Sequence, residues 1–360
     1  MLHTPDRGLY GRLGVTLLVL LAYRVGCHLP LPGLDTQKIG LLYEGGGSAT
    51  ARVSVLALGI MPLLSALILL EIGKLAAPGL RTWERATPRN QRLYGYVAIS
   101  LALVLALVQS AGIASALEQV TALVPEPGAA FRVVAIATLM AGTALVIAFA
   151  NIIDRAGLGS GVWIMFLAPV LAELPRTIAG MAVLHQNGEY PFELILAGLA
   201  ITVFAVGGIV RLLMAARGAE AVASTCTWTP LLSYSLLPWL LFLIGLIATL
   251  RAEGAAALMT SGPLRFILLA VLVVGVSALS LRSFARTGQM SPVPAAIVVL
   301  TLTALVVATD IAQSYFFAVP PLGSTDLVVA TVVALAILGQ SGGVGSRAQP
   351  EDGPPLSPQV

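Results

Sequence analysis

The sequence predicts an all-α polytopic membrane protein with ten transmembrane helices. Of its 360 residues, 58% are hydrophobic and only 10% are charged, and the mean hydropathy is +0.93. Ten apolar stretches follow one another, and most of the segments that separate them contain arginine. Each is about long enough to cross a bilayer, whose hydrocarbon core of about 30 Å needs about 20 helical residues. The stretches lack the alternation of a barrel strand, so only helices can satisfy their backbone in lipid.

The spans are expected in the following order. The first five are residues 13–27, 53–70, 94–117, 131–153 and 162–184. The second five are residues 194–210, 231–250, 266–281, 293–309 and 327–338, of which the last is the shortest. Charged side chains mark the boundaries: Arg12 and Arg92 precede the first and third spans, Asp154 follows the fourth, and Arg211 and Arg251 follow the sixth and seventh.

The distribution of cations predicts the orientation. With the N-terminus in the cytoplasm, most of the 20 Lys and Arg residues fall in cytoplasmic segments. The positive-inside rule therefore favours both termini in the cytoplasm, as an even number of spans requires. No polar interval is long enough to bury a core of its own, so we expect neither a soluble domain nor an enzyme.

No cofactor and no metal are expected. The sequence has no GxxxxGK[ST] motif, and His3, His28 and His185 are scattered. The segment GLGSG, residues 157–161, follows a membrane helix rather than a strand. Its glycines are therefore interpreted as allowing a tight turn and close helix packing.

The second span contains the segment RVSVLALGIMP, residues 52–62, in which Gly59 and Pro62 interrupt a continuous apolar run. Both residue types weaken or bend helices, and bent membrane helices often line internal cavities. Ordinary packing is the alternative, because Gly and Pro are common in membrane helices.

The longer segment RVSVLALGIMPLLSALIL, residues 52–69, closely resembles the second span of the SecY protein-translocation channel family. Residues 22–35 (AYRVGCHLPLPGLD), 89–114 (RNQRLYGYVAISLALVLALVQSAGIA) and 154–175 (DRAGLGSGVWIMFLAPVLAELP) are similar to the end of its first span, its third span and the beginning of its fifth. A proline in the seventh span and LGSTDLVV before the tenth agree more weakly. The resemblance covers about residues 12–340 and is strongest in the first half.

This resemblance implies a SecY-like clamshell of two inverted five-helix halves, residues 12–187 and 188–340. Together they would form one transmembrane domain, residues 1–340. Residues 341–360, rich in Gly and Pro, would be a disordered cytoplasmic tail. The implied function is that of a protein-conducting channel subunit in the bacterial inner membrane, which translocates unfolded polypeptides or inserts them into the membrane.

The resemblance also implies the site. A lateral gate would lie between spans two and seven, with helix bends at Gly59, Pro62 and Pro238. Family channels seal their waist with a ring of bulky aliphatic residues. The matching positions here are Ile60, Leu64, Ile68, Phe166, Val170, Leu240 and Val328. All are apolar, as a seal requires, and a charge at mid-membrane would cost about 3 kcal/mol on insertion scales. The alternative is that these are ordinary core residues.

Two departures from the family pattern qualify the implied partners. The partners would be a SecE-like clamp subunit, a SecG-like subunit, and a SecA-like motor ATPase or a ribosome. The two cytoplasmic loops that would dock the motor or ribosome are compressed to residues 211–229 and 282–292. They retain the docking candidates Arg211, Arg217, Arg282 and Arg286. These short loops predict a specialised channel. The interval 32–52 is also short for the family's plug helix, which predicts a reduced or mobile plug.

Other charges are interpreted structurally. Glu71 with Lys74 and Glu173 with Arg176 are expected to pair at i,i+3 spacing. The arginines from 81 to 92 are expected to face lipid headgroups. Asp310 is placed at the end of the ninth span, at the membrane interface, and Asp326 near the start of the tenth helix.

Two other functions stay open. A secondary transporter of a small solute also uses inverted repeats and broken helices, although it would need polar groups near the membrane midplane. A nonconducting membrane scaffold derived from a channel would explain the shortened loops.

Overall fold

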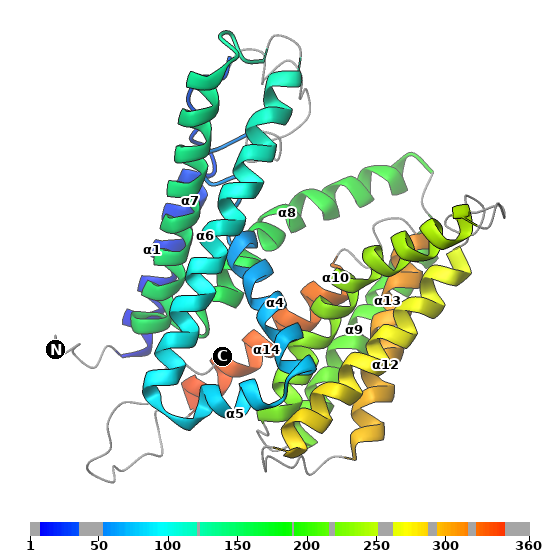
Figure 1. Cartoon of the computed structure of the whole chain (residues 1–360). Coiled ribbons are helices and arrows are strands. Elements are labelled where there is room, and N and C mark those ends of the chain that lie inside the picture. The colour runs from blue at the N-terminus through cyan, green and yellow to red at the C-terminus, as the bar shows by residue number, and fades with distance from the viewer. Residues whose placement is uncertain are drawn as a thin grey trace. The chain divides into compact units, whose positions relative to one another are not determined.

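Helices make up nearly all of the described part of the computed structural model (Figure 1). The structure describes residues 8–35, 53–120, 123–188, 191–215, 220–250, 262–286, 294–315 and 322–342. The helices are α1 (Leu9–Gly26), α4 (Met61–Ala76), α5 (Gly79–Ala86), α6 (Pro88–Gln119), α7 (Ala129–Ala156), α8 (Gly161–Gln186), α9 (Phe192–Ala215), α10 (Glu220–Leu250), α12 (Gly262–Arg286), α13 (Ala295–Tyr315) and α14 (Ser324–Gly342).

The helices confirm the predicted all-α, multi-pass fold. Within the described residues, eight helices are each long and apolar enough to cross a membrane. α4 and α5, between which the chain bends by 114°, pass the same test together and count as a ninth span if the pair crosses the membrane as one. Ser324–Leu335, the apolar part of α14, is a shorter helix, as expected for the last span. The helices are therefore consistent with ten spans.

The expected start of the second span was wrong. Residues 53–60 form turns, and α4 begins only at Met61. Pro62 is thus the second residue of the helix, where its missing N–H has no helical partner to lose. Gly59 precedes the helix with a positive φ of 53°, a conformation that glycine adopts at little cost. Neither residue bends a continuous helix.

The expected loop over residues 211–229 was also largely wrong. α9 continues to Ala215 and α10 already begins at Glu220. The first turns of α10 bury Val222, Cys226 and Trp228, and this burial favours helix over loop. The connection between the two helices is therefore shorter than the sequence indicated.

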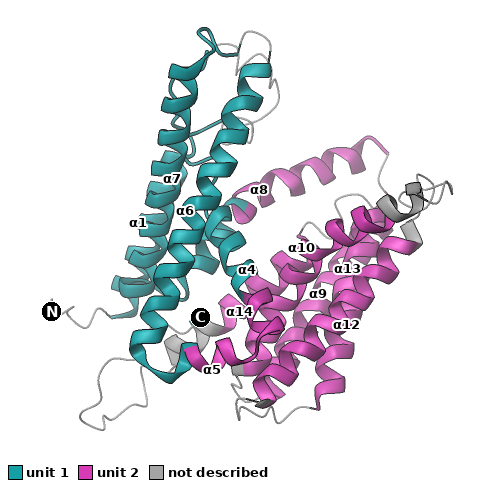
Figure 2. Ribbon diagram, in the orientation of Figure 1, with its two compact units in different colours: residues 1–70, 84–169, 336–360 teal, residues 71–83, 170–335 magenta. Residues whose placement is uncertain are grey.

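The chain divides into two compact units (Figure 2). Unit 1 contains residues 1–70, 84–169 and 336–360, and unit 2 contains residues 71–83 and 170–335. The inverted halves expected from the resemblance stay a prediction.

In unit 1, α6 packs against α7, and α7 packs against α1 (Figure 1). The packed face of α6 carries a small buried residue at every fourth position: Ala98, Ala102, Ala106, Ser110 and Ala114. Such spacing lets helices approach closely in lipid, where van der Waals packing rather than the hydrophobic effect holds them together. The helix starts at a well-formed cap, because the Thr87 hydroxyl accepts the Asn90 N–H at 3.2 Å and Pro88 follows it.

In unit 2, α12 packs against both α10 and α13, and α13 also contacts α9. Their shared core contains Ile209, Leu269, Val273, Leu302 and Val306, among others. A hydrogen bond of 3.0 Å between the Thr225 and Ser280 hydroxyls joins α10 to α12 inside this core. Buried polar contacts of this kind reinforce helix packing in membranes.

Candidate functional site

The turns before α4 are anchored by the segment that follows α1. Pro30 and Ser54 form an antiparallel bridge, and the Leu31 N–H donates to the Val53 carbonyl at 2.9 Å. The backbone groups of residues 53–60 therefore find partners outside a helix, which explains why this apolar run does not start as one.

Two glycines let this anchored segment lie close to α1 and α7. A Cβ added at Gly142 of α7 would lie 2.0 Å from the Val55 carbonyl oxygen. A Cβ added at Gly26 of α1 would lie 2.4 Å from Cδ1 of Leu56. Real Cβ atoms do not approach other atoms so closely, so a larger residue at Gly142 would have to displace the Val55 backbone, whereas one at Gly26 would have to displace the end of the Leu56 side chain. The contacts fix where α4 begins.

The first three ring candidates follow at this point. The Ile60 carbonyl accepts the Leu64 N–H at 3.0 Å. Leu64 and Ile68 share one face of α4, and Ile60 precedes them at the same spacing. Ile60 and Leu64 are each only 3% exposed, whereas Ile68 is half-buried. Ile60 therefore precedes the helix that the sequence expected it to belong to, and the place of these three residues in a pore ring stays a prediction.

The fifth-span candidates lie on α8. Phe166 is buried and contacts Trp163 edge to face, with ring centroids 6.5 Å apart. Val170, one turn later, is half-buried. Phe166 belongs to unit 1 and Val170 to unit 2.

The last two ring candidates lie in unit 2. Val328 of α14 is fully buried and belongs to the core of that unit. Leu240 of α10 is half-buried and follows Pro238, which lies inside the helix. The candidates are thus distributed over both units, and their meeting in one ring stays a prediction.

A glycine-rich turn sets the start of α8, and with it the position of Phe166. A Cβ at Gly161 would lie 1.9 Å from the Ala150 carbonyl oxygen of α7. The Gly161 N–H donates to the Asp154 carboxylate at 2.6 Å. The tight turn and close helix packing predicted for residues 157–161 are therefore confirmed.

A buried ion cluster lies where α4 turns into α5. Lys74 Nζ lies 2.8 Å from one carboxylate oxygen of Glu71, and Arg81 Nη2 lies 3.0 Å from the other. The Arg81 guanidinium also stacks 4.1 Å from the ring centroid of Phe284 on α12. The predicted pairing of Glu71 with Lys74 is confirmed. The expectation that Arg81 faces lipid headgroups was wrong, since its side chain is buried.

The sequence contained a signal that could have identified this cluster. Pro78 and Gly79 lie where α4 gives way to α5 and favour a reversal of the chain. Such a reversal returns Arg81 to the second, unused oxygen of Glu71.

A second polar network surrounds the buried side chain of Asp310, and its cation, Arg265, is exposed. Asp310 Oδ1 accepts hydrogen bonds from Arg265 Nη2 at 2.9 Å and from the Tyr234 hydroxyl at 3.1 Å. The Tyr234 oxygen in turn accepts the Ser324 hydroxyl at 2.9 Å. The network joins α10, α12, α13 and α14. Asp310 does not end its helix as expected, because α13 continues to Tyr315 and the carboxylate is buried. Asp326 lies in the first turn of α14, as predicted.

The structure describes only part of the expected docking surface. Arg211 on α9 and Arg282 on α12 are exposed. Arg217, the side chain of Arg286, the plug interval 36–52 and residues 343–360 lie outside the described part. Within the described ranges, no three His, Cys, Asp or Glu side chains gather as metal ligands would.

Comparison with known proteins gives one consistent family. The family model of SecY matches residues 54–319. Protein translocase subunit SecY of Escherichia coli (strain K12) is 32% identical over 210 residues, which are 54% of this chain and 47% of that protein. The same subunit of Buchnera aphidicola subsp. Acyrthosiphon kondoi is 31% identical over 210 residues, 54% of this chain and 59% of that protein. The chain thus spans about half the length of the curated relatives it matches.

Solved structures share the fold at low sequence identity. Sec61 in the canine ribosome–channel complex from the endoplasmic reticulum has a TM-score of 0.59 at 13% identity and covers 94% of both chains. A structure described as a protein-conducting channel has a TM-score of 0.59 at 12% identity, again over 94% of both chains. These similarities show that the chain has the SecY/Sec61 channel fold.

Proposed function

This chain belongs to the SecY family, and from that membership we propose that it is a subunit of a protein-conducting channel through which unfolded polypeptides cross or enter the membrane. The observation that carries the proposal is the anchored start of α4. There, the sequence that most resembles the family's second span folds as a fixed turn that leads into Ile60 and Leu64.

An apolar ring would seal around the passing chain without chemistry of its own. The proposed ring consists of Ile60, Leu64, Ile68, Phe166, Val170, Leu240 and Val328. None of these side chains carries a charge, so the ring would neither bind nor repel particular segments of the polypeptide. A lateral gate between α4 and α10, where Pro238 interrupts the helical hydrogen bonds, would release apolar segments into lipid.

The work of translocation would come from a partner. The chain carries no nucleotide-binding motif, so a SecA-like motor ATPase or a ribosome would supply the driving force. A SecE-like clamp subunit and a SecG-like subunit would complete the complex. Docking would take place at the membrane face that carries Arg211 and Arg282, with both termini in the cytoplasm. The short connection between α9 and α10 supports a channel specialised for few substrates or for a different driver.

Site-specific photocrosslinking tests the channel directly. A photoreactive amino acid is placed at Ile60 or at Phe166, and membrane vesicles receive a secretory precursor stalled by a folded C-terminal domain. We expect crosslinks from both positions to the precursor. The control is Val104 on α6, which is 58% exposed on the surface of unit 1 and should not label the precursor.

The same experiment separates the alternatives. If Ile60 and Phe166 fail to crosslink while the precursor is stalled in vesicles with a functional channel, the channel proposal is wrong and a scaffold is favoured. The Asp310 network is the polar feature that a transporter would use, but Arg265 already neutralises its carboxylate. Saturable flux of a small solute into proteoliposomes would favour the transporter.

A further inference from the structure

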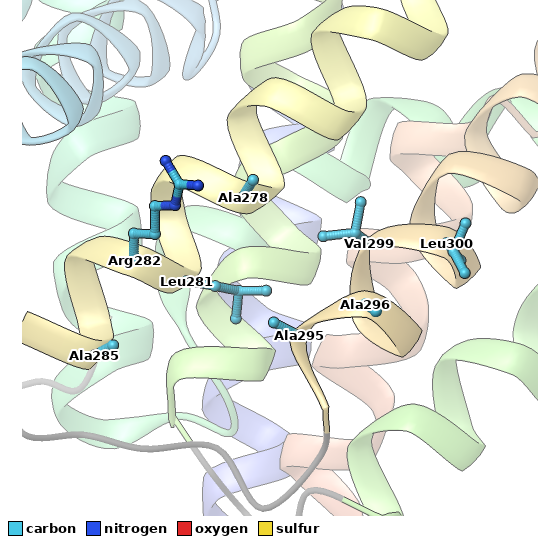
Figure 3. A pocket seen from close by; sticks show the side chains of 8 residues that line it. All are labelled: Ala278, Leu281, Arg282, Ala285, Ala295, Ala296, Val299 and Leu300. Carbon is cyan, nitrogen blue, oxygen red and sulfur yellow. The ribbon is translucent and has the colours of Figure 1, made fainter.

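The cytoplasmic candidate Arg282 borders a groove that the channel function does not use. The groove lies between α12 and α13, entirely within unit 2, and has a volume of about 530 Å³ (Figure 3). Its walls include Ala278, Leu281 and Ala285 of α12 and Ala296 and Leu300 of α13. The alanines leave the space open, and among the described residues that line the groove Arg282 is the one charged side chain.

The exposed face of α12 places Arg282 at a membrane boundary. This face is apolar at Ile267, Val271 and Leu279 and then changes to arginine at Arg282. Arg265 lies at the other end of the apolar stretch, and the 17 residues from it to Arg282 span about 25 Å of helix. A hydrocarbon core is about 30 Å thick, so a helix that crosses it from Arg265 would bring Arg282 close to the lipid headgroups of the other face.

Arg282 is available to an anion at this depth. Its side chain is exposed, and no ion pair joins it to another described residue. Arg282 lines the groove, and in Figure 3 its guanidinium lies near Ala278 of the same helix, farther from Val299 and Leu300 of α13. A guanidinium offers paired N–H donors that match the oxygens of a phosphate. Ala295 and Ala296, the first residues of α13, also line the groove, so the positive end of that helix dipole adds to the same potential.

We propose that this groove binds an anionic phospholipid, with the phosphate at Arg282 and the first part of one acyl chain between α12 and α13. The apolar wall and the single cation at its headgroup end complement such a molecule. The seven residue steps from Ala278 to Ala285 span about 10 Å, a third of the hydrocarbon core. A membrane helix of a partner protein, about 10 Å wide and in need of a longer contact, fits this short groove less well.

A photoreactive lipid tests the site without any transport assay. The purified full chain is placed in lipid nanodiscs that contain phosphatidylglycerol or phosphatidylcholine with a photoreactive group on the acyl chain. Labelled peptides are then identified by mass spectrometry. We expect phosphatidylglycerol to label the walls of the groove, and Arg282→Gln to reduce this labelling about five-fold, the effect of one cation near a membrane surface. Arg282→Lys should retain most of it.

Matched variants separate the groove from general surface charge. Arg211→Gln removes another exposed arginine and should leave labelling of the groove unchanged. Ala278→Leu keeps Arg282 but fills the groove and should reduce labelling, whereas Ala304→Leu, at an exposed position of α13 outside the groove, should not.

Two outcomes would overturn the proposal. One is equal labelling by the two lipids that Arg282→Gln does not change, which would indicate only surrounding bilayer lipid. The other is capture of a small membrane protein instead of lipid by a photoreactive group at Leu300 in native membranes. The lipid site is a proposal that goes beyond the channel function. Failure of the lipid site would leave the channel proposal standing, and failure of the channel proposal would leave the lipid site standing.

Discussion

Glu71 accepts hydrogen bonds from two cations in a buried site. The stability of the region between α4 and α5 therefore depends strongly on this side chain. Bringing charges out of water is costly, and mutual pairing offsets that cost only while every partner is present. Burial therefore makes this cluster sensitive to single substitutions in a way that exposed arginines are not.

Replacing Glu71→Gln should destabilise the protein strongly. It leaves Lys74 and Arg81 buried without their shared anion, and loss of one partner from a buried ion pair costs about 3 kcal/mol or more. Thermal unfolding of the purified protein in detergent, followed by circular dichroism, measures the loss as a lower Tm.

The control for this change is Arg89→Gln, which removes an exposed charge from α6 and should alter the free energy of unfolding by less than about 0.5 kcal/mol. Changing Glu71, Lys74 and Arg81 together to leucine should recover much of the loss, because a buried cluster can be replaced by apolar packing. Equal Tm values for Glu71→Gln and the unchanged protein would contradict the assignment of Glu71 as the shared anion of Lys74 and Arg81.

At the scale of the elements, the turn before α4 and the turn before α8 both lie close to α7. Each close approach is possible because one of the two contacting residues is a glycine. Gly142 faces the Val55 carbonyl, and Gly161 faces the Ala150 carbonyl. Both turns lead into helices that carry ring candidates, so these contacts position Ile60 and Phe166 through the backbone. This positioning does not require the side chains of the ring to contact one another.

Gly142→Ala should therefore destabilise unit 1. The added methyl would lie 2.0 Å from a backbone oxygen that is held in place by pairing with the segment after α1. Overpacking of this kind costs about 1–3 kcal/mol, measurable by the same unfolding assay. In a crosslinking experiment, Gly142→Ala should also weaken labelling from Ile60.

Gly112→Ala is the matched control, since nothing lies within 4 Å of a Cβ at that position of α6. Better helix propensity should make this variant equal to the unchanged protein or up to about 1 kcal/mol more stable. If both glycine variants were equally stable, the close approach of Val55 to α7 would be refuted.

For the molecule as a whole, the proposed docking of a motor or a ribosome depends more on the connections between the helices than on the helices themselves. The chain shares the SecY/Sec61 fold over 94% of its length, yet it spans about half the length of its curated bacterial relatives. Helix α10 starts only a few residues after α9 ends. In the proposed channel, this short connection would offer little surface to a motor or a ribosome.

We expect this chain to restore growth poorly in a bacterium depleted of its general SecY subunit. The membrane fold would be present, but the loops that dock a general driver would be too short. Growth and export of a reporter precursor provide the measurement, with expression of the chain checked in the membrane fraction. Full rescue would refute the specialised function, whereas copurification of a SecE-like protein would support assembly of a channel complex.

Hydropathy by itself determined that this protein is a multi-pass helical membrane protein, because each span in lipid must satisfy its own backbone hydrogen bonds. Local resemblance identified the family and the apolar row at Ile60, Leu64 and Ile68, since both depend on residues that are neighbours in the chain. The i,i+3 pairing of Glu71 with Lys74 was predictable for the same reason.

Only the tertiary structure decided where α4 begins, that Arg81 is buried and that Asp310 pairs with Arg265. Each of these features depends on groups far apart in sequence: Pro30 meets Ser54, Phe284 meets Arg81, and Tyr234 meets Asp310. Periodicity and local propensity describe a residue's neighbours along the helix. They carry no information about which distant backbone or side chain will satisfy a polar group once the helices pack.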